Sequence, residues 1–523
     1  MKKGFIAFVF CALLTACGTG AEPSSISVKP RTIVCTDGEV DDYDSFIRLL
    51  LYSNEMNIEA IVYSASQWHW AGDGNGTLLL PENRADKGGM NPPQFDAPKE
   101  SHRWIGTDWI PELIDAYGEV WPNLVRHDAS YPSAEHLKSL IKMGNVRVEG
   151  DMAEPTEGSD AIKAIMLDDK PGKVYFQAWG GTNTFARALL SIEEEYKGTD
   201  KWDAVYQKVC EKMVLYIIQD QDGTYVNYVS KSWPDIKAIY NANQFISFAY
   251  LWKPTVPQPW HKYLKGEWFR ENIVNDHGPL TAKYLGAGIP YPFDDPEDHY
   301  GDPEMVQRMP GADFNDFISE GDSPSYFFIF DFWGLRSLEH PEWGSIGGRF
   351  NVVKPGLWED PLTRGGFRPF GPQPEPDGLT LDRKAGDFNP FTCRVDMMYP
   401  QTRWVEVLQN DFAARADWCI KLYEDANHAP SVMVTHLDIS AKPGETVSIK
   451  ANASDPDGDG VDISFWQYRE AGTSDALLEI HPDGTFDIPA DAVPGTTLHV
   501  IVQATDSGSP SLTRFQRVIV TVL

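Results

Sequence analysis

The most constraining feature of the chain is an alternation of short apolar runs with segments of helical periodicity, beginning near residue 32. Thr32–Cys35 and Ile58–Tyr63 are apolar enough to be strands, and Tyr43–Ser53 between them repeats its large apolar residues at helical spacing. Continuous apolar strands joined by a helix form a βαβ unit, whose strands are parallel and covered on both faces. This unit indicates an α/β fold, because right-handed crossovers leave few other topologies.

The same alternation resumes further along the chain. The expected elements are a helix at 161–167, a strand at 174–179, a helix at 184–192 and a strand at 212–218. We therefore predict an open, mostly parallel sheet, in which ligands bind at the carboxyl ends of the strands. Residues 254–378 are rich in Pro, Gly and Trp and are predicted to form long loops over those ends. Within them Tyr326–Phe330 is predicted to be a buried strand, and a helix is expected afterwards at 411–423.

A different pattern begins after a linker at Asn427–Pro430. Apolar and polar residues then alternate in short segments, which are separated by turn sequences such as Asp455–Gly458 and Pro482–Gly484. Short alternating strands separated by turns indicate a β-sandwich of the immunoglobulin or cadherin kind. The predicted domains are therefore a large α/β domain at 31–425 and a sandwich at 426–523.

The N-terminal segment has the features of a bacterial lipoprotein signal. Basic residues precede a short apolar run, and Leu14-Thr15-Ala16-Cys17 has the order of a lipobox. We expect residues 1–16 to be removed as a signal peptide, Cys17 to carry lipid and residues 17–30 to form a tether. An ordinary secretory signal with an incidental cysteine is the alternative. Gly18 indicates sorting to the outer membrane, and the lipid is the only evident anchor because no later segment is long and apolar enough to span a bilayer.

The balance of charge limits the possible partners. The 523 residues include 45 basic and 76 acidic ones, a formal net charge of −31. A nucleic-acid binder needs a basic stripe, and none is evident, so we predict no nucleic-acid partner. Acidic chains also suit divalent cations, although most acidic residues are expected to form a solvated surface. The aromatic content of 12% offers faces for sugar rings as well as for the core.

An acidic segment follows the first predicted strand directly. Its sequence is Asp37-Gly38-Glu39-Val40-Asp41-Asp42, and its place in a β-to-α turn puts the carboxylates at the carboxyl end of the sheet. Asp37 and Asp42 can bind one hard cation through oxygen, the ligand that calcium prefers. Helix capping by acidic residues is the alternative, but a cap needs a single Asp. We therefore predict a metal-binding or catalytic role.

The pattern Asp-x-x-x-Asp-Asp after a first strand resembles the metal loop of the calcium-dependent nucleoside hydrolases. The chain is more specifically similar to nucleoside-hydrolase-like bacterial proteins described as cellulose-binding, which carry a C-terminal sandwich. Further points of resemblance are Thr182-Asn183 after a glycine pair and Asp322 in Glu320-Gly321-Asp322-Ser323. The resemblance implies calcium as cofactor and the following roles: Asp37 as calcium ligand and general base, Asp42 and Asp322 as further ligands, Thr182 as a ligand through its carbonyl, and Asp41, Gln67 and Asn183 as substrate-binding residues.

The sequence also departs from the nucleoside-hydrolase pattern. Cys35 stands where an Asp usually lies two residues before the first metal ligand, and Ser66-Gln67 replaces a Gly-Asn pair. Gly321 stands where many of these enzymes have a histidine at the catalytic site. That last change argues against activation of a purine-like leaving group.

Hydrolysis of an O-glycoside needs a proton donor in addition to a base. His69 and His277 are candidates, as are Asp220 and Asp222, which follow the strand that ends at Ile218. His277 lies in a predicted loop, where its side chain can instead simply face solvent. Asp220 and Asp222 can likewise belong to a polar turn without a role in catalysis. Around His69, Trp68 and Trp70 are expected either to form a sugar platform or to pack beneath neighbouring loops.

The predicted sandwich contains a second acidic loop, Asp455-Pro456-Asp457-Gly458-Asp459-Gly460. It resembles the first half of an EF-hand loop but lacks the final Glu and the flanking helices, so it either binds calcium or simply forms a turn.

Three functions remain open on this evidence. The first is calcium-dependent hydrolysis of a glycosidic bond by a surface lipoprotein, and the second is non-catalytic binding of a cellulose-like polysaccharide. The third is nucleoside hydrolysis, which the lipid anchor and the sandwich make a weaker candidate. The ligand expected in the first two cases is a carbohydrate or polysaccharide.

Overall fold

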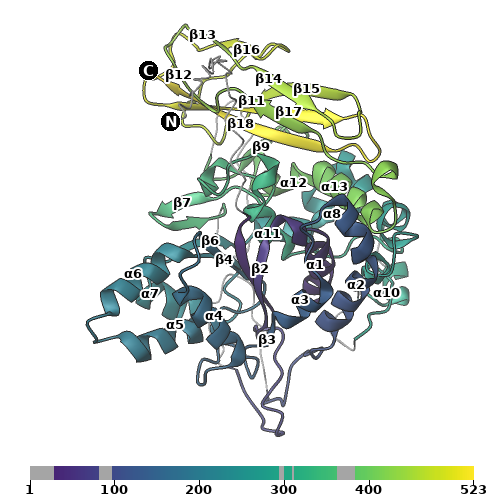
Figure 1. Cartoon of the computed structure of the whole chain (residues 1–523), viewed down its shortest axis with the longest axis vertical. Coiled ribbons are helices and arrows are strands. Elements are labelled where there is room, and N and C mark those ends of the chain that lie inside the picture. Colours follow the sequence, from purple (N-terminus) through teal and green to yellow (C-terminus); the bar gives the residue numbers. More distant parts are fainter. Residues whose placement is uncertain (1–28, 82–96, 294–299, 309–310, 362–382) are drawn as a thin grey trace, which may run out of the picture.

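The computed structural model describes residues 29–81, 97–293, 300–308, 311–361 and 383–523 (Figure 1). The predicted signal peptide, the lipidated Cys17 and nearly all of the tether lie outside the described residues. Within the described ranges, no helix is long and apolar enough to cross a membrane.

The larger domain is built on an eight-stranded sheet with the strand order β3-β2-β1-β4-β5-β6-β8-β7. Its strands are β1 (Arg31–Thr36), β2 (Asn57–Tyr63), β3 (Ile141–Met143), β4 (Val174–Ala178), β5 (Met213–Ile218), β6 (Lys237–Asn241), β7 (Asn351–Lys354) and β8 (Leu357–Glu359). Neighbouring strands are parallel except for the antiparallel pair β7–β8. The predicted α/β fold is thus confirmed. The strand order reverses between β1 and β4, and sheets of this kind bind ligands at such a reversal.

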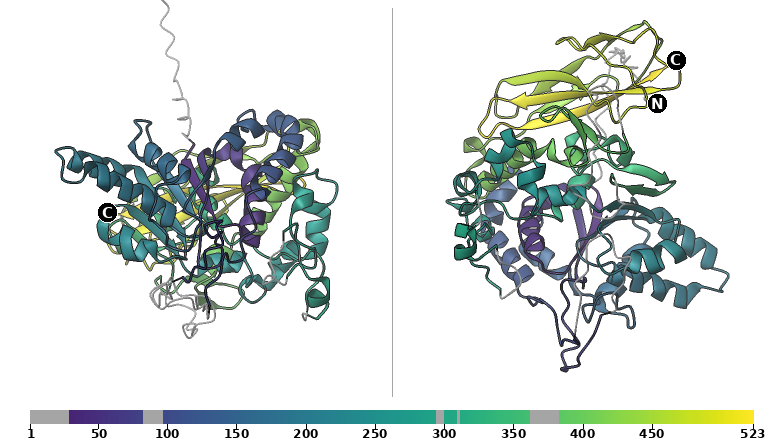
Figure 2. Two further views of the ribbon diagram at one scale, coloured as in Figure 1. Left: turned by 90° about the horizontal axis from the view of Figure 1, so that it is seen from below. Right: turned by 180° about the vertical axis from the view of Figure 1, so that it is seen from behind.

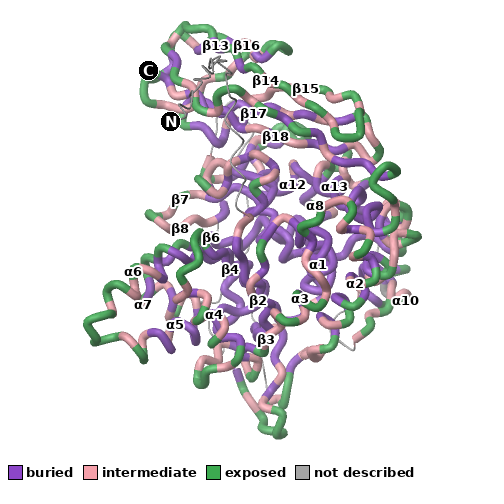
Figure 3. Tube along the Cα trace, in the orientation of Figure 1, coloured by how far each residue is buried: buried purple, intermediate pink, exposed green. Residues whose placement is uncertain are grey.

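Each face of the sheet has its own apolar core, because successive side chains along a strand point to opposite faces. Val34 of β1 lies in one core, whereas Ile33 and Cys35 lie in the other. The first core is covered by α1 (Val40–Leu51), α2 (Trp109–His127), α11 (Ser323–Ile329) and α13 (Val405–Trp418), and the second by α4 (Glu157–Leu167), α5 (Asn183–Tyr196) and α6 (Trp202–Lys212). The central strands are accordingly buried along their length (Figure 3).

Shorter helices complete the larger domain. They are α3 (Ala134–Ser139), α7 (Ser230–Ser232), α8 (Trp252–Thr255), α9 (Gly266–Phe269), α10 (Pro303–Arg308) and α12 (Tyr399–Thr402). Residues 254–361, predicted to be long loops, contain several of these short helices. The described parts of the connection between β2 and α2, residues 64–81 and 97–108, project beyond the sheet, away from the sandwich (Figures 1 and 2).

The prediction of a strand at Tyr326–Phe330 is wrong. Tyr326–Ile329 belong to α11, which begins after Asp322 with Pro324 in its first turn, and Phe330 is the C-cap of this helix. Every residue of α11 is buried. A short helix that is buried on all sides has no amphipathic period, so the apolar run within it cannot be distinguished from a buried strand.

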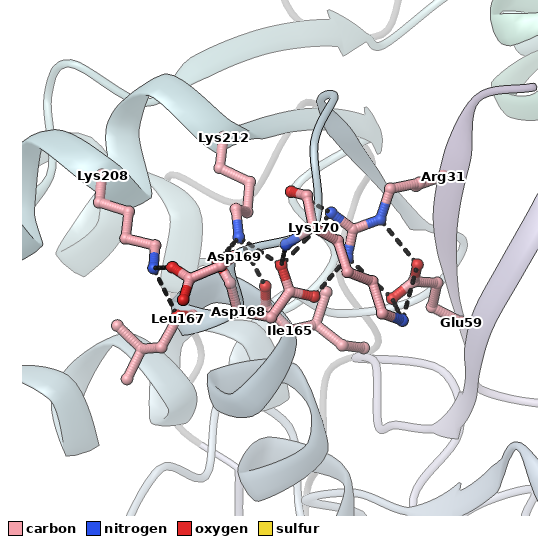
Figure 4. A network of polar contacts seen from close by, with 9 residues as sticks. All are labelled: Arg31, Glu59, Ile165, Leu167, Asp168, Asp169, Lys170, Lys208 and Lys212. Atoms are coloured by element: carbon pink, nitrogen blue, oxygen red, sulfur yellow. Dashed lines mark hydrogen bonds and ion pairs between the residues drawn. The ribbon is translucent and has the colours of Figure 1, made fainter. Parts of the chain in front are cut away.

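A network of charged side chains connects β1 and β2 to the ends of α4 and α6 (Figure 4). Arg31, which is only 5% exposed, donates to the carboxylates of Glu59 and Asp168. Lys212 at the end of α6 donates to Asp168 Oδ1 at 2.6 Å. The network fixes the amino end of β1, from which the chain runs to the acidic loop.

The C-terminal domain consists of short strands around a separate apolar core. The strands are β11 (Ser431–Val434), β12 (Asp438–Ala441), β13 (Thr446–Ser448), β14 (Ala451–Ser454), β15 (Val461–Gln467), β16 (Thr485–Asp487), β17 (Thr497–Asp506) and β18 (Thr513–Val522). One sheet has the order β12-β18-β17-β15, and β11–β14 and β13–β16 form two-stranded sheets. Side chains from several of these sheets meet in one core, which confirms the predicted sandwich.

The sandwich packs directly on the larger domain (Figure 2). The fully buried carboxylate of Asp387 accepts from Arg349 Nε at 2.6 Å and from Tyr468 Oη at 2.7 Å. Arg517 of β18 donates to the carbonyl oxygens of Leu335 and Gly344 at 2.7 Å each. These bonds make the interface a fixed one.

Candidate functional site

The acidic loop connects β1 to α1. Gly38 has a φ of +84°, which a glycine adopts without strain. Glu39 is the N-cap of α1, and its backbone N–H donates to Asp42 Oδ2 at 3.1 Å. Asp42 Oδ1 accepts from the Asp37 N–H at 3.2 Å and from the Thr36 hydroxyl. Asp42 therefore caps the helix, as the alternative interpretation of this loop held, and at the same time faces other carboxylates.

Three carboxylates form a buried group at the carboxyl end of the sheet. Asp41 and Asp42 from α1 meet Asp322, which precedes α11, and their nearest oxygens all lie within 4.8 Å of one another. Burial, followed by repulsion between the carboxylates, raises the pKa of Asp322 well above its usual range, and the same causes act on Asp41 and Asp42. Asp322 Oδ2 has no hydrogen-bond partner among the described residues. An oxygen-only group with uncompensated charge fits a hard cation such as calcium.

Asp37 lies beside this group. Its carboxylate is 1% exposed, its charge acts on Asp42 and Asp322, and it also lies within 4.8 Å of the nearest Glu39 oxygen and His69 nitrogen. Burial opposes ionisation of Asp37, but the neighbouring His69 outweighs it and lowers the pKa. Gly180, after β4, packs so closely that a Cβ there would lie 2.6 Å from Asp37 Cγ.

A pocket of about 150 Å³ opens beside these carboxylates. It is lined by acidic side chains, aromatic rings and amides from the loops after β1, β2, β4, β5 and β6: Glu39, Asp41, Asp42, Trp68, Arg103, Trp179, Ile218, Gln219, Gln221, Phe245, Ile246 and Tyr250. Asp37 and Asp322 are buried and are not among the lining residues. The mixture of carboxylates and aromatic faces suits a polyhydroxylated ring, whose hydroxyls donate to oxygens and whose C–H faces pack on aromatics.

Two other residues that were predicted to belong to the site form hydrogen bonds within the fold. The Thr182 carbonyl accepts the Ala186 N–H at 2.9 Å, as part of α5. The Asn183 side chain donates to the carbonyl of Asn145 at 2.7 Å and accepts the Thr184 N–H. Neither side chain lines the pocket.

The four proposed proton donors lie in different places. Asp220 accepts the N–H groups of Tyr225 and Val226, and Asp222 accepts those of Asn183 and Thr224, so both carboxylates stabilise local backbone. His277 Nε2 lies 3.2 Å from Asp417 Oδ1 on α13, outside the site. His69 alone lies with the acidic loop.

The aromatic segment after β2 divides into two parts. Trp68 lines the pocket, whereas Trp70 is fully buried against Ala65. Gln67 is buried, and its Oε1 has no hydrogen-bond partner among the described residues. The packing interpretation thus applies to Trp70, whereas a sugar platform at Trp68 stays a prediction.

Sequence analysis gave no role to several pocket residues. Glu39 accepts from the Tyr250 hydroxyl at 3.2 Å, and Trp179 and Phe245 supply further aromatic walls. Glu39 was visible in the acidic loop itself. Phe245 and Tyr250 follow β6, a strand that the sequence pattern did not reveal.

The loop Asp455–Gly460 in the sandwich forms a turn. Asp455 Oδ1 accepts the N–H groups of Asp457 and Asp459, and Asp457 Oδ1 lies 3.0 Å from His428 Nδ1 in the linker. The three carboxylates nonetheless lie within 4.8 Å of one another, so calcium binding there stays a prediction.

Comparison with known families identifies the class of protein. Residues 31–350 match the family described as cellulose-binding Sde182, nucleoside hydrolase-like domain, and residues 446–522 match cellulose-binding protein Sde0182, C-terminal domain. The first match covers more than half of the chain, which therefore belongs to this nucleoside-hydrolase-like family. The resemblance drawn from the acidic loop is thus confirmed.

A solved structure supports the same fold. A nucleoside hydrolase-related hypothetical protein from Saccharophagus degradans, associated with carbohydrate metabolism, matches with a TM-score of 0.64 and 22% identity, over 95% of this chain and 100% of its own. Drosophila N-cadherin EC1–4 and human CDH23 EC21–23 each match 18% of this chain at 20% identity and a TM-score of 0.14, over 24% and 33% of their own chains. No curated protein matches the chain.

Proposed function

We propose that this chain is a surface lipoprotein that hydrolyses a glycosidic bond in a carbohydrate, with Asp37 as the base that takes a proton from water. The observation that carries the proposal is the convergence of buried carboxylates and an aromatic-lined pocket where the strand order reverses. The family's description as cellulose-binding supports a carbohydrate ligand. The acidic lining disfavours nucleic acid.

Calcium is the proposed cofactor, and the residues fit it. Asp37, Asp42 and Asp322, with Asp41 beside them, present only oxygen atoms, and their repulsion in a buried site favours a divalent cation. When bound, calcium would offset that charge and make a neighbouring water more acidic. Thr182 remains a proposed ligand through the second lone pair of its carbonyl, since the first accepts the Ala186 N–H.

The chain's own residues would bind and orient the sugar. Asp41 faces the pocket and can accept hydroxyl groups, while Trp68 and Trp179 offer aromatic faces to the ring. Gln67 and Asn183, assigned to the substrate by the resemblance, are buried and are not among the lining residues. The surrounding carboxylates would favour the positive charge that develops on a sugar during glycosidic cleavage.

The proposed location is the outer membrane. The lipobox ending at Cys17 would supply a lipid anchor after removal of residues 1–16. A single acyl signal gives weak attachment, so stable anchoring needs the additional acyl chains that bacterial lipoproteins carry on this cysteine.

Glycan binding without hydrolysis is the second candidate, and a specific observation favours it. Asp220 and Asp222 are occupied by backbone hydrogen bonds, and His277 is paired with Asp417 outside the site. His69 is then the one proposed proton donor that adjoins the acidic loop. Hydrolysis of nucleosides is a third candidate and is disfavoured by Gly321, the sandwich and the lipobox.

The test is release of products from a panel of polysaccharides, oligosaccharides and nucleosides, with calcium and with chelator. Asp37→Asn is compared with wild type and with Asp115→Asn, an exposed carboxylate on α2 that serves as control. Release that needs calcium and is lost only in Asp37→Asn supports the hydrolase. Absence of release, with glycan binding equal in all three proteins, overturns it in favour of the binding function.

A further inference from the structure

We propose that a buried ion pair, Arg48 with Glu320, sets the spacing of the carboxylates that would bind calcium. Asp42, with Asp41 beside it, lies in the first turn of α1, and Asp322 precedes α11. Arg48 lies in the last turn of α1, and Glu320 lies two residues before Asp322. The pair therefore joins the two segments that carry these carboxylates. The proposal rests on the proposed calcium site and adds two positioning residues to it.

Arg48 and Glu320 are both fully buried. The guanidinium donates twice to the carboxylate, from Nε to Oε2 at 2.5 Å and from Nη2 to Oε1 at 2.8 Å. A planar fork of this kind fixes the orientation of both partners. The Tyr284 hydroxyl also donates to Oε1, and the Ser323 hydroxyl donates to Oε2 at 2.7 Å. Both oxygens of Glu320 are therefore occupied, in contrast to Asp322 Oδ2, which has no hydrogen-bond partner among the described residues.

The Arg48 side chain is also held by α13. Its Nη2 donates to Gln409 Oε1 at 2.7 Å, and its guanidinium carbon lies 3.7 Å from the centroid of the Phe412 ring. Charge-assisted hydrogen bonds and a cation–π contact in a buried site leave the side chain little freedom. Arg48 is therefore a fixed point against which Glu320 is placed.

Three residues on one face of α1 contact the segment 320–323. They stand at positions i, i+4 and i+7 of the helix: Asp41, Ser45 and Arg48. Ser323 Oγ lies 3.2 Å from Ser45 Oγ, and a Cβ at Gly321 would lie only 2.5 Å from an Asp41 oxygen. The ion pair lies about 10 Å along the helix from Asp41, because each residue rises about 1.5 Å. It therefore fixes the position of the segment along α1, and with it the distance from Asp322 to the carboxylates of the helix.

Stability alone does not explain a buried ion pair. Removing two charges from water costs about as much as their attraction gains, and apolar residues of similar volume often serve as well. The best-supported use of such pairs is to fix one register between two elements. Because the two charges cancel, Arg48 and Glu320 place the segment without changing the net charge beside the cation.

The test is calorimetric titration of the full chain, stripped with chelator, with Ca²⁺ and separately with Mg²⁺. Arg48→Lys keeps the charge but loses the fork. Arg48→Met combined with Glu320→Gln removes both charges and keeps an acceptor oxygen at position 320. Neither change alters the net charge, so a purely electrostatic role of the pair predicts unchanged calcium affinity. We expect both proteins to bind Ca²⁺ about tenfold more weakly than wild type, with the same number of sites per chain.

The ratio of the Ca²⁺ affinity to the Mg²⁺ affinity separates positioning from a loss of folded protein. Calcium accepts oxygens at about 2.3–2.6 Å in flexible geometry, whereas magnesium needs a smaller octahedral site. A displaced Asp322 should therefore lower the ratio, whereas partial unfolding would lower the number of sites and leave the ratio unchanged. Arg31→Lys is the matched control, since Arg31 donates to Glu59 through the same fork at the amino end of β1.

Thermal unfolding in chelator shows which variants are folded, and either variant alone suffices if the other does not fold. Calcium affinity equal to that of wild type in a folded variant overturns the inference, as does an equal loss of affinity in Arg31→Lys. If wild type itself binds no Ca²⁺, the calcium site and this inference are both overturned. The titration needs no substrate, so a failure to detect hydrolysis would count against the proposed reaction and not against the ion pair.

Discussion

Gly321 lies directly against Asp41: a Cβ at position 321 would be 2.5 Å from Asp41 Oδ2 and 3.3 Å from Phe245 Cδ2. The first distance is far below van der Waals contact, so Asp41 occupies the space that a side chain at position 321 needs.

Gly321→Ala should disturb the site more than the addition of a single methyl group suggests. Asp41 would have to move away from Asp322, and we expect the calcium-induced rise in melting temperature to shrink, together with any glycan affinity. Thermal unfolding with calcium and with chelator measures the effect. Asp115→Asn, which changes an exposed carboxylate on α2, is the control. Equal calcium effects in the two variants would contradict the crowding.

Trp68 and Trp70 should respond to truncation in opposite ways. Trp68 lines the pocket, so Trp68→Ala should weaken glycan binding about tenfold with little change in stability. Trp70 is fully buried, so Trp70→Ala should lower the free energy of unfolding by about 3–5 kcal/mol. Calorimetric binding of oligosaccharides and urea unfolding measure the two effects. A Trp68→Ala variant that binds as wild type would remove Trp68 from the binding surface.

Asp322→Asn should separate calcium binding from helix capping. Asp42→Asn confounds the two, because Asp42 also accepts the N–H groups of Asp37 and Glu39. Asp322 Oδ2 has no hydrogen-bond partner among the described residues, and burial and repulsion disfavour its charge. In chelator, Asp322→Asn should therefore melt above wild type.

With calcium, the order of the two proteins should reverse. A ligand at 100 times its Kd stabilises a protein by about 2.7 kcal/mol, and wild type should gain this while Asp322→Asn gains little. Scanning calorimetry and metal analysis check both halves. Asp115→Asn should follow wild type throughout, and an undiminished calcium effect in Asp322→Asn would exclude this residue as a ligand.

The fold class could be predicted from the sequence because the pattern of apolar residues that indicates each helix or strand lies within that element. β1, α1 and β2 each carry their own periodicity, and the acidic loop falls between two of them. The buried helix α11 was missed because it has no polar face, and β6 was missed because its short apolar run stands among aromatic loops. Residues such as Thr182 and Asp222 were assigned by position, whereas their hydrogen bonds depend on neighbours far away in sequence.

The grouping of the carboxylates was also beyond the sequence. Asp37 and Asp42 were expected to bind one cation because they share a loop. The first turn of α1 also brings Asp41 and Asp42 to Asp322, and Asp37 lies near both Asp42 and His69, so a cation shared by Asp37 and Asp42 stays a prediction. The direction of a side chain in the first turn of a helix is fixed by the backbone geometry of that turn. The spacing of residues in the sequence does not give this direction when a loop precedes the helix.

The charged network at the start of β1 should make stability depend on acid. Burial opposes ionisation of Glu59 and Asp168, but bonds to Arg31, Lys170 and Lys212 outweigh it and lower both pKa values. Carboxylates with lowered pKa values stabilise the fold fully at pH values above their ordinary pKa, which is 4.5 for Glu59 and 3.8 for Asp168. This stabilisation is lost as the pH falls through the lowered pKa values.

Arg31→Gln should therefore destabilise most at neutral pH. We expect a loss of about 1.5–3 kcal/mol there, the contribution of hydrogen bonds to charged groups, and a smaller difference from wild type near pH 3.5. Urea unfolding at the two pH values measures it. Lys208→Gln is the control in the same network, since its partner Asp169 has a fully solvated side chain (Figure 4). A pH-independent loss in Arg31→Gln would mean that its packing matters rather than its charge.

Asp387 should couple the unfolding of the two domains. It is fully buried at their interface and bound by Arg349, Arg403 and Tyr468. Asp387→Ala leaves buried cations without their partner, which costs about 3–5 kcal/mol. We expect wild type to unfold in one calorimetric transition and Asp387→Ala to unfold in two, the sandwich separating first or last.

Asp475→Ala removes an ion pair of the same interface whose carboxylate is 80% exposed, and should cost at most about 1 kcal/mol without splitting the transition. Two transitions already present in wild type would show that the domains are independent despite this contact.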